Sequence, residues 1–464
     1  MKARWVVGVV VGALVVSLAG PAAAGQGDKI VRTKSLLGLP VITNACAVLG
    51  CTVLGSLDVL PGDTTSPSSL FLVRGLVQNT VTWLMSLLGI AAVEPDLPVG
   101  VALDDSWGSS QASVAVLDSL WHRTPMTYYG STAWQAYFEQ PASAIVRLPQ
   151  THCSLRATGG AIVAVIDTGV DPNHATLAAV LTDGYDFTRD VAGGDEVADA
   201  GQAPASLDGA YCVNQASVAV LDQASVAVLD GTQYAAFGHG TMVAGVVHLV
   251  APTARIMPLK AFTADGQGYT SSILRAVYYA SLKGAKVLNM SFSRPTSSPE
   301  LKRAIDNATG NGLVAVAAAG NDGQATLVYP AAYSNVMGVA STTNADTRSS
   351  FSNYGSNLVW VAAPGEGVIT TYPFGSFAAA WGTSFSTPFV SGGAALLAGL
   401  QGGASYSQVS SAIARAKTLT SDLGYGRLDL YRAVQYGRSL WPSAPLSAVP
   451  ASCASDGVDW SAAP

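Results

Sequence analysis

Residues 161–171 read AIVAVIDTGVD, and this stretch decides the fold class. Small and β-branched apolar residues run without interruption up to Asp167, which is typical of a strand buried on both faces. Comparable apolar runs, separated by helical segments, cover residues 255–259, 286–290, 313–318, 336–340 and 358–362. The alternation predicts an α/β fold in which a three-layer, mostly parallel sheet has helices on both faces.

Three polar residues in separate motifs have the chemistry for nucleophilic acyl transfer. Asp167 ends a predicted strand, where α/β folds place their sites. His239 lies in GHGTMVAG (residues 238–245), at the start of a predicted helix. Ser384 lies in GTSFSTP (residues 382–388), just ahead of an apolar helix whose N-terminal field favours developing negative charge. Together they offer a hydroxyl nucleophile, a base and a carboxylate that orients the base.

In this chain order, the three motifs closely resemble those of the subtilisin-like serine peptidases. The resemblance covers about residues 161–435 and implies a serine endopeptidase that works through an acyl-enzyme. It also implies that Asn321, in AAGN (residues 318–321), donates to the oxyanion beside the Ser384 amide. The rival interpretation is a catalytically silent peptide-binding or scaffold protein with the same fold, and the intact triad and oxyanion residues argue against it.

The same resemblance implies two segments that flank an extended substrate and a pocket between them. The implied substrate-binding residues are Gly266, Gln267, Gly268, Ser291, Phe292, Ser293, Ala319, Gly320 and Val328. The family usually has glycine at the position of Ser293, and some relatives have glycine at that of Val328. Larger side chains there predict a shallow pocket that prefers small or medium apolar residues just before the cut.

The implied mechanism needs no cofactor, and we assign no metal ligand. Met242 replaces a histidine that relatives often have three residues after the catalytic one. Thr176 stands where relatives often have a calcium-binding Asp. A calcium requirement is conceivable in this family, but the sequence does not support one.

The N-terminus is typical of a secretory signal in residues 1–24. Lys2 and Arg4 precede an apolar run over residues 5–19, and cleavage after Ala24 is expected. The alternative, an anchoring helix, is disfavoured because the run is shorter than the roughly 20 residues that a membrane span needs. We therefore expect a secreted protein, extracellular or periplasmic, without membrane association after signal removal.

Residues 25–98 are predicted to form a small ferredoxin-like α+β domain. Strands are expected at residues 30–33, 52–60, 70–77 and 90–93, with helices at 41–49 and 80–88, in split βαβ order. By its position and its closing strand at residues 91–96, this domain resembles the family's inhibitor-like propeptide. That implies an intramolecular inhibitor and folding aid, with self-cleavage somewhere between residues 98 and 145.

Residues 99–157 are irregular and rich in aromatics, and are interpreted as a linker or an N-terminal extension of the mature enzyme. The peptidase domain is expected over residues 158–437, followed by a Pro/Ser/Ala-rich tail at 438–464 that is either an ordered wrap or a loose end. The octapeptide QASVAVLD occurs at residues 111–118 and twice in tandem at 215–230. It is interpreted as a duplicated insertion in a tolerant loop, with a strand-pairing device as the alternative.

Composition limits the partners of the chain. Charged residues make up 12% and the formal net charge is −6, so a nucleic-acid partner is excluded for lack of a basic field. The expected partners are protein or peptide substrates and the chain's own propeptide. Five cysteines form no metal-ligand spacing. Bridges Cys46–Cys51 and Cys153–Cys212 are conceivable, as are buried thiols, and the connectivity stays open.

Overall fold

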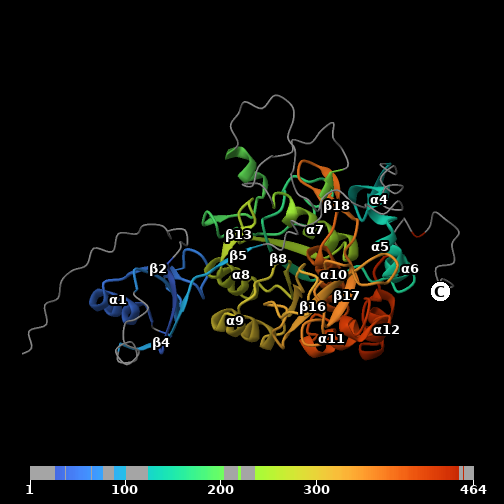
Figure 1. Cartoon of the computed structure of the whole chain (residues 1–464). Helices are drawn as coiled ribbons and strands as arrows, with labels where there is room; N and C mark the ends of the chain where they lie inside the picture. The colour runs from blue at the N-terminus through green and yellow to red at the C-terminus, as the bar shows by residue number, and fades with distance from the viewer. Residues whose placement is uncertain are drawn as a thin grey trace, which may run out of the picture.

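The predicted apolar runs form one continuous sheet in the computed structural model, which describes residues 27–36, 38–63, 65–76, 88–100, 124–202, 218–220, 236–448 and 453 (Figure 1). The strand order is β10-β9-β12-β8-β14-β15-β16-β17. From β9 to β17 every neighbouring pair is parallel, whereas β10 pairs antiparallel at the edge. The strands are β8 (Ile162–Asp167), β9 (Tyr185–Asp186), β10 (Val191–Ala192), β12 (Arg255–Lys260), β14 (Val287–Met290), β15 (Val314–Ala318), β16 (Val336–Thr342) and β17 (Val361–Pro364). The predicted mostly parallel α/β sheet is confirmed.

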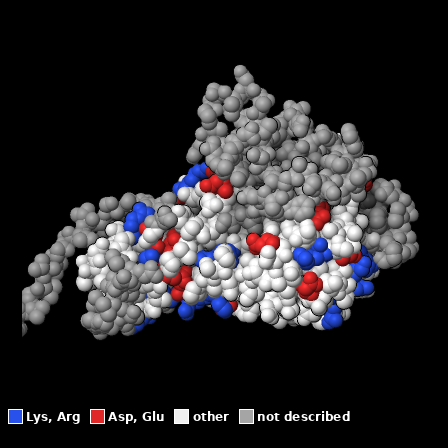
Figure 2. All heavy atoms as spheres, in the orientation of Figure 1, with Lys and Arg blue, Asp and Glu red and all other residues white. Residues whose placement is uncertain are grey.

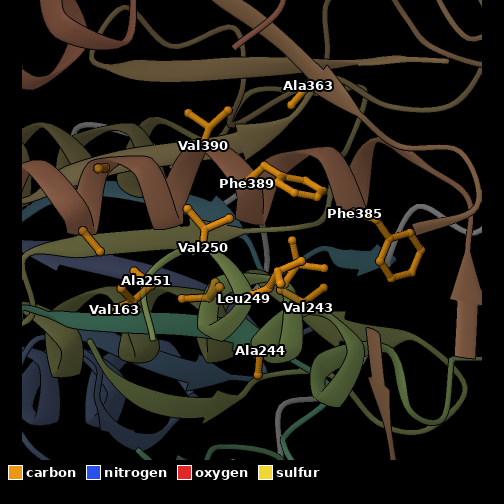
Figure 3. Close-up of a cluster of buried hydrophobic side chains, with 14 of the residues drawn as sticks. Val163, Val243, Ala244, Leu249, Val250, Ala251, Ala363, Phe385, Phe389 and Val390 are labelled. Atoms are coloured by element: carbon orange, nitrogen blue, oxygen red, sulfur yellow. The ribbon is translucent and has the colours of Figure 1, made fainter. Parts of the chain in front are cut away.

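Alternating side chains of the strands build two separate cores, one on each face of the sheet. Val163 and Val165 of β8 pack in the core that contains α7 (His239–Val250) and α10 (Thr383–Leu400). Ala164 and Ile166 pack in the core that contains α8 (Thr270–Leu282) and α9 (Pro299–Gly310). In Figure 3, Phe389 and Val390 of α10 lie next to Val250 of α7. Full burial of one such side chain contributes about 1.5–3 kcal/mol, which explains the uninterrupted apolar runs.

A second, smaller sheet and two C-terminal helices complete the larger body. Strands β18 (Val368–Tyr372) and β19 (Ser376–Ala380) form a hairpin, and β11 (Val218–Val220) pairs antiparallel with β19. The remaining elements are η1 (Val197–Gln202), η3 (Ser421–Leu423), α11 (Tyr406–Ile413) and α12 (Leu430–Leu440). Since β19 leads within four residues to Ser384, this hairpin borders the candidate site.

Part of the stretch predicted to be irregular has regular structure. It contains β6 (Pro125–Tyr128), β7 (Ser131–Trp134), α4 (Gln135–Phe138), α5 (Pro141–Ile145) and α6 (Leu148–Cys153). The Tyr128 hydroxyl donates to the Leu249 carbonyl at 2.5 Å, and the Tyr137 hydroxyl donates to the Gly245 carbonyl at 2.6 Å. These buried contacts dock residues 124–153 on α7, so this part of the stretch belongs to the core of the larger body.

The N-terminal body is a four-stranded antiparallel sheet with one described helix against it. Its elements are β1 (Lys29–Thr33), α1 (Gly38–Leu49), β2 (Thr52–Ser56), β3 (Leu70–Arg74) and β4 (Ile90–Pro95), and the sheet order is β2-β3-β1-β4. Val31, Ile42 and Phe71 are fully buried between sheet and helix. Each predicted strand is found. The predicted second helix, the signal and the octapeptide at 111–118 lie outside the described residues.

The described residues contain two disulfides, and one differs from the pairing considered above. Cys46 pairs with Cys51, as the sequence allowed. Cys153 pairs with Cys453, so the conceivable Cys153–Cys212 bridge is wrong; Cys212 itself lies outside the described residues. Near this bridge the Arg156 Nε donates to the Ser447 carbonyl at 2.7 Å, and the Ser447 amide donates back to the Arg156 carbonyl at 3.0 Å. The tail up to residue 448 is therefore an ordered wrap.

The described part of one face of the molecule carries charges of both signs side by side (Figure 2). Figure 2 shows Lys and Arg interspersed with Asp and Glu over the described part of the face in view. Among the described residues, no helix has the length and apolar character needed to cross a membrane.

Removing the Cys153–Cys453 bridge should destabilise the larger body, because the bridge joins residues 300 positions apart. Closing a long loop restricts the unfolded chain, and the loss is expected to be about 2–5 kcal/mol. We expect Cys153→Ser/Cys453→Ser to lower the Tm by about 5–15 °C in calorimetry. Cys46→Ser/Cys51→Ser, which opens a bridge between residues only 5 apart, is the matched control. Equal Tm values for both variants would contradict this account.

Candidate active site

Asp167 and His239 are in direct contact inside the protein. The Nδ1 of His239 lies 2.7 Å from Oδ1 of Asp167, and the two residues are 2% and 1% exposed. Asp167 is the last residue of β8, and His239 is the first of α7. The same Asp167 oxygen accepts from the Thr168 amide at 2.8 Å. The carboxylate is thus held from two sides and fixes one edge of the imidazole ring.

A glycine permits the approach that brings these residues together. A Cβ on Gly240 would lie 2.0 Å from the carbonyl oxygen of Gly169, far inside van der Waals contact. Gly238, which precedes α7, has a φ of 89°, in the left-handed region that favours glycine. The Gly240 amide donates to the Thr168 hydroxyl at 2.9 Å. The first turn of α7 is therefore locked against the turn that follows β8.

Glu196 is a buried acid that ties this junction together, and sequence reasoning missed it. Its carboxylate accepts from the Gly238 amide at 2.8 Å, from the Thr241 amide at 3.0 Å and hydroxyl at 2.5 Å, and from the Thr168 hydroxyl. Burial raises the pKa of Glu196, against the effect of these hydrogen bonds. All of these donors flank Asp167 or His239 in the chain. No local pattern around GGDEVAD signals this role.

Lys260 lies buried on the other side of the same turn. Its Nζ donates to the carbonyls of Thr168 at 2.6 Å and Phe262 at 2.8 Å, and to Oδ2 of Asp199 at 2.7 Å. Burial lowers the pKa of Lys260 to about 8, although nearby carboxylates including Glu196 oppose this shift. Lys260 thus anchors the backbone that follows Asp167.

Ser384 precedes a residue that contacts His239, but its own hydroxyl is bonded to another partner. It is the second residue of α10, and the ring of the following Phe385 lies 5.4 Å from the His239 ring. The Ser384 Oγ donates to the Ser291 carbonyl at 3.0 Å, and the Ser291 hydroxyl donates to the Ser384 carbonyl at 2.8 Å. His239 Nε2 has no hydrogen-bond partner among the described residues. The structure therefore forms the contact between Asp167 and His239, but not one between His239 and Ser384.

Asn321 is held at the start of α10 by its amide oxygen. That oxygen accepts from the Thr383 amide at 2.9 Å and from the Thr383 hydroxyl at 2.8 Å. A Cβ on Gly382 would lie 3.4 Å from Nδ2 of Asn321. The amide nitrogen Nδ2 therefore faces Gly382, two residues before Ser384. An oxyanion donor that acts beside Ser384 is expected in such a position.

The implied substrate segments border the same region. Strand β13 (Gln267–Tyr269) pairs antiparallel with β5 (Pro98–Gly100), so the edge of β13 already holds an extended strand of this chain. Phe292 is buried with its ring 5.0 Å from that of Phe262. Val328 is 5% exposed, Ser293 is half-buried, and Ala319 and Gly320 continue from β15 to Asn321. A Cβ on Gly320 would lie 3.5 Å from the Ser293 hydroxyl, so these segments adjoin.

Comparison with known proteins assigns the family. Residues 158–431 match the Subtilase family. The chain belongs to the subtilase family. Thermitase from Thermoactinomyces vulgaris is 36% identical over 281 residues, which cover 60% of this chain and 89% of thermitase. Subtilisin BL from Lederbergia lenta is 41% identical over 169 residues, covering 34% of this chain and 62% of that relative.

A solved structure agrees with the sequence relatives. A protease from Pseudoalteromonas arctica PAMC 21717 superposes with a TM-score of 0.52 at 30% identity, and the match covers 69% of this chain and 97% of that one. This subtilase is a serine-type endopeptidase with a subtilisin-like α/β fold.

Thr176 and Met242, the two positions at which this subtilase departs from the family pattern, are both engaged in contacts within the protein. The Thr176 hydroxyl donates to the Thr132 carbonyl at 2.8 Å, so it is engaged with the segment ahead of the peptidase domain. Met242 is fully buried in the core around α7. In the part of the chain that the structure describes, no group of three or more His, Cys, Asp or Glu side chains could hold a metal ion.

Glu196→Gln should lower kcat at least tenfold and leave KM nearly unchanged. The side-chain amide nitrogen cannot accept, so donors around Thr168 and Thr241 lose their acceptor, at about 1–3 kcal/mol for each buried group. Glu196 is 0% exposed, so it cannot contact substrate directly.

The matched control is Asp346→Asn, which removes a carboxylate that accepts from Lys417 and Arg427 away from this site. Steady-state kinetics should separate the two variants. Equal kcat values for both would contradict a positioning role for Glu196.

Proposed function

We propose that this subtilase is a secreted endopeptidase that is made as a self-cleaving precursor, with Asp167, His239 and Ser384 as its catalytic triad. The observation that carries the proposal is the buried 2.7 Å contact between His239 and Asp167 beside the N-terminus of α10. A carboxylate on Nδ1 holds the imidazole with Nε2 available as a base. Rotation of the Ser384 side chain away from Ser291 brings its hydroxyl to that base.

The proposed reaction follows from these positions. The Ser384 Oγ attacks the scissile carbonyl while His239 takes its proton, and Asp167 stabilises the resulting imidazolium. The oxyanion accepts from the Ser384 amide and from Nδ2 of Asn321. His239 then returns the proton to the leaving amine, and water hydrolyses the acyl-enzyme. In this mechanism no cofactor takes part.

The N-terminal body, residues 25–98, is proposed to be a ferredoxin-like inhibitory propeptide. Its strand order, β2-β3-β1-β4, is that of a split βαβ unit, and the residues predicted to form the second helix of that unit fall outside the described ones. The pairing of β5 with β13 supports inhibition, because substrate needs the same strand edge. Cleavage downstream of β5 and release of this body would open the site.

Carboxylates of the closing strand bind helix N-termini of the larger body. Asp96 accepts from the Ser271 amide at 2.9 Å and hydroxyl at 2.6 Å, at the start of α8. Glu94 accepts from the Ser298 hydroxyl at 2.6 Å and the Glu300 amide at 3.3 Å, at the start of α9. Burial disfavours the charged carboxylates and raises the pKa of both groups, and it outweighs these hydrogen bonds and the field of the helix N-termini, which favour the charge. Arg32 adds an ion pair with Glu300, with Nη2 and Oε2 2.6 Å apart.

Ser384→Ala should stop precursor conversion entirely, because no other hydroxyl replaces the nucleophile. Asn321→Ala should slow it, since loss of one oxyanion donor in subtilisin lowers kcat about 100- to 1000-fold. The measurement is the rate at which the precursor band disappears on gels. Conversion of the Ser384→Ala precursor at the wild-type rate would place processing in another protease.

We further propose that the pocket prefers small or medium apolar residues just before the cut. Val328 and Phe292 are buried and Ser293 is half-buried, and in this proposal the first two fill the base of the pocket while Ser293 narrows its edge. Val328→Gly should widen the pocket and raise kcat/KM for peptides with Phe at that position relative to Ala. A peptide library cleaved equally well after large aromatic and small residues by the wild-type enzyme would refute the preference.

Release of the propeptide should become easier as pH rises. Burial raises the pKa of Asp96 to about 6 in the docked state, and burial also raises the pKa of Glu94. The docked carboxyl binds a proton more tightly than the released one, so this contribution to docking is complete in acid and declines as pH rises through about 6.

We expect the cleaved complex to dissociate roughly 10- to 100-fold more readily at pH 8 than at pH 4, as measured by size-exclusion chromatography. Asp96→Asn removes the titrating group and should flatten the profile. A profile that is as steep in Asp96→Asn would assign the effect to other groups.

A further inference from the structure

Three residues of one copy of the octapeptide, Val218–Val220, form a strand in the structure. Within residues 215–222, β11 pairs antiparallel with β19, in the register Val218 with Ala380, Ala219 with Ala379 and Val220 with Ala378. The other edge of β19 pairs with β18. The endopeptidase mechanism does not use this pairing. A chain segment of identical sequence follows directly, at residues 223–230.

We propose that the edge of β19 is a binding site for an extended Ser-Val-Ala-Val strand, and that the tandem copies are interchangeable occupants of it. Strand pairing depends on backbone hydrogen bonds, and side chains only select the register. Val226, Ala227 and Val228 repeat Val218, Ala219 and Val220. The second copy therefore offers β19 the same backbone and the same side chains, shifted by one octapeptide along the chain.

The partner surface on β19 suits either copy equally. Ala378, Ala379 and Ala380 are at most 1% exposed and belong to the core that contains α7 and α10. Their methyl groups impose little shape selection on the strand that pairs beside them. The octapeptide contains no proline and has one charge, at its terminal Asp, so every residue from Ser to the second Val can enter a ladder.

The path of the chain also permits the second copy to replace the first on β19. Because β11 is antiparallel to β19, its C-terminal end points to the turn before β19, where Phe374 lies. The ring of Phe237 stacks on Phe374 with centroids 5.9 Å apart. From Phe374 to Ala378 the chain covers about 13 Å at strand spacing. The eight residues from Val228 to Ala236 reach at most about 26 Å, so the second copy can dock without moving α7.

Occupancy of this edge bears on the nucleophile. Trp381 and Gly382 connect β19 to α10, and the Gly382 amide donates to the Gly365 carbonyl at 2.9 Å. The following Thr383 holds Asn321. A strand docked on β19 therefore steadies the segment that carries Ser384. Two equivalent copies make that support redundant, since damage to one leaves the other available.

The test disrupts each copy separately and then both. Ala219→Pro/Val220→Pro removes strand donors from the first copy, and Ala227→Pro/Val228→Pro is the matched change in the second. Hydrogen exchange of those β19 amides that face β11 is measured in full-length Ser384→Ala protein to avoid autolysis, and the amides that face β18 serve as an internal reference. We expect each double variant to keep wild-type protection and the four-proline variant to exchange at least tenfold faster.

Activity of the same variants with Ser384 intact gives a second readout. Each double variant should keep wild-type kcat/KM, and the four-proline variant should lose at least tenfold. If the first double variant alone lost protection or activity, the second copy would not be replacing the first, and the proposal would be wrong. This result does not require the four-proline variant to fold. Full protection in the four-proline variant would also overturn the proposal. Neither outcome depends on whether the precursor cleaves itself.

A peptide experiment tests the site directly. The synthetic octapeptide Gln-Ala-Ser-Val-Ala-Val-Leu-Asp should bind the four-proline Ser384→Ala protein, as measured by calorimetry. Its affinity should be at least tenfold lower for Ser384→Ala protein with one intact copy, because that copy already occupies the edge of β19. Binding in the substrate cleft would be equal in both proteins. Equal affinity would therefore overturn the proposed site on β19.

Discussion

The contact between the turn after β8 and the first turn of α7 is the constraint on which the site depends. Parallel strands end at one edge of the sheet, so Asp167 is delivered there by the fold itself. His239 reaches it only because Gly240 lets the helix approach the Gly169 carbonyl, where a Cβ would lie 2.0 Å away. Glu196 and Thr168 then tie both sides of the contact together. Buried polar groups are tolerated there because nearly every donor has a partner.

Helices α7 and α10 pack in one core and carry His239 and Ser384. Helix α10 packs against α7 through Phe389, Val390 and Val250, which fixes the start of α10 relative to His239 (Figure 3). Ser384 and Thr383 lie at that start, and Asn321 binds Thr383 from the end of β15. Packing of these elements thus brings the parts of the candidate site together, and the proposed mechanism requires in addition a rotation of the Ser384 side chain.

The sequence predicted the central sheet because buried strands leave a local signal, and the motifs also singled out Asp167 and His239, which lie in contact. Uninterrupted apolar runs mark buried strands, and Gly-rich motifs mark close approaches. Residues 124–153 were missed because their helices are too short to show a period and depend on tertiary contacts such as that of Tyr137. Glu196 and the Cys153–Cys453 bridge were missed because their partners are distant in the chain. The hydrogen bond from Ser384 to Ser291 is a rotamer choice that no pattern encodes.

Covalent labelling measures whether Asp167 and His239 activate Ser384. Processed protein, freed of its N-terminal body, is treated with a fluorophosphonate, and the modified peptide is identified by mass spectrometry. We expect a single modification at Ser384, with a labelling rate that falls sharply in Asp167→Asn because the imidazole loses its orientation. Absence of labelling in the folded, processed protein, or an unchanged rate in Asp167→Asn, would contradict this activation.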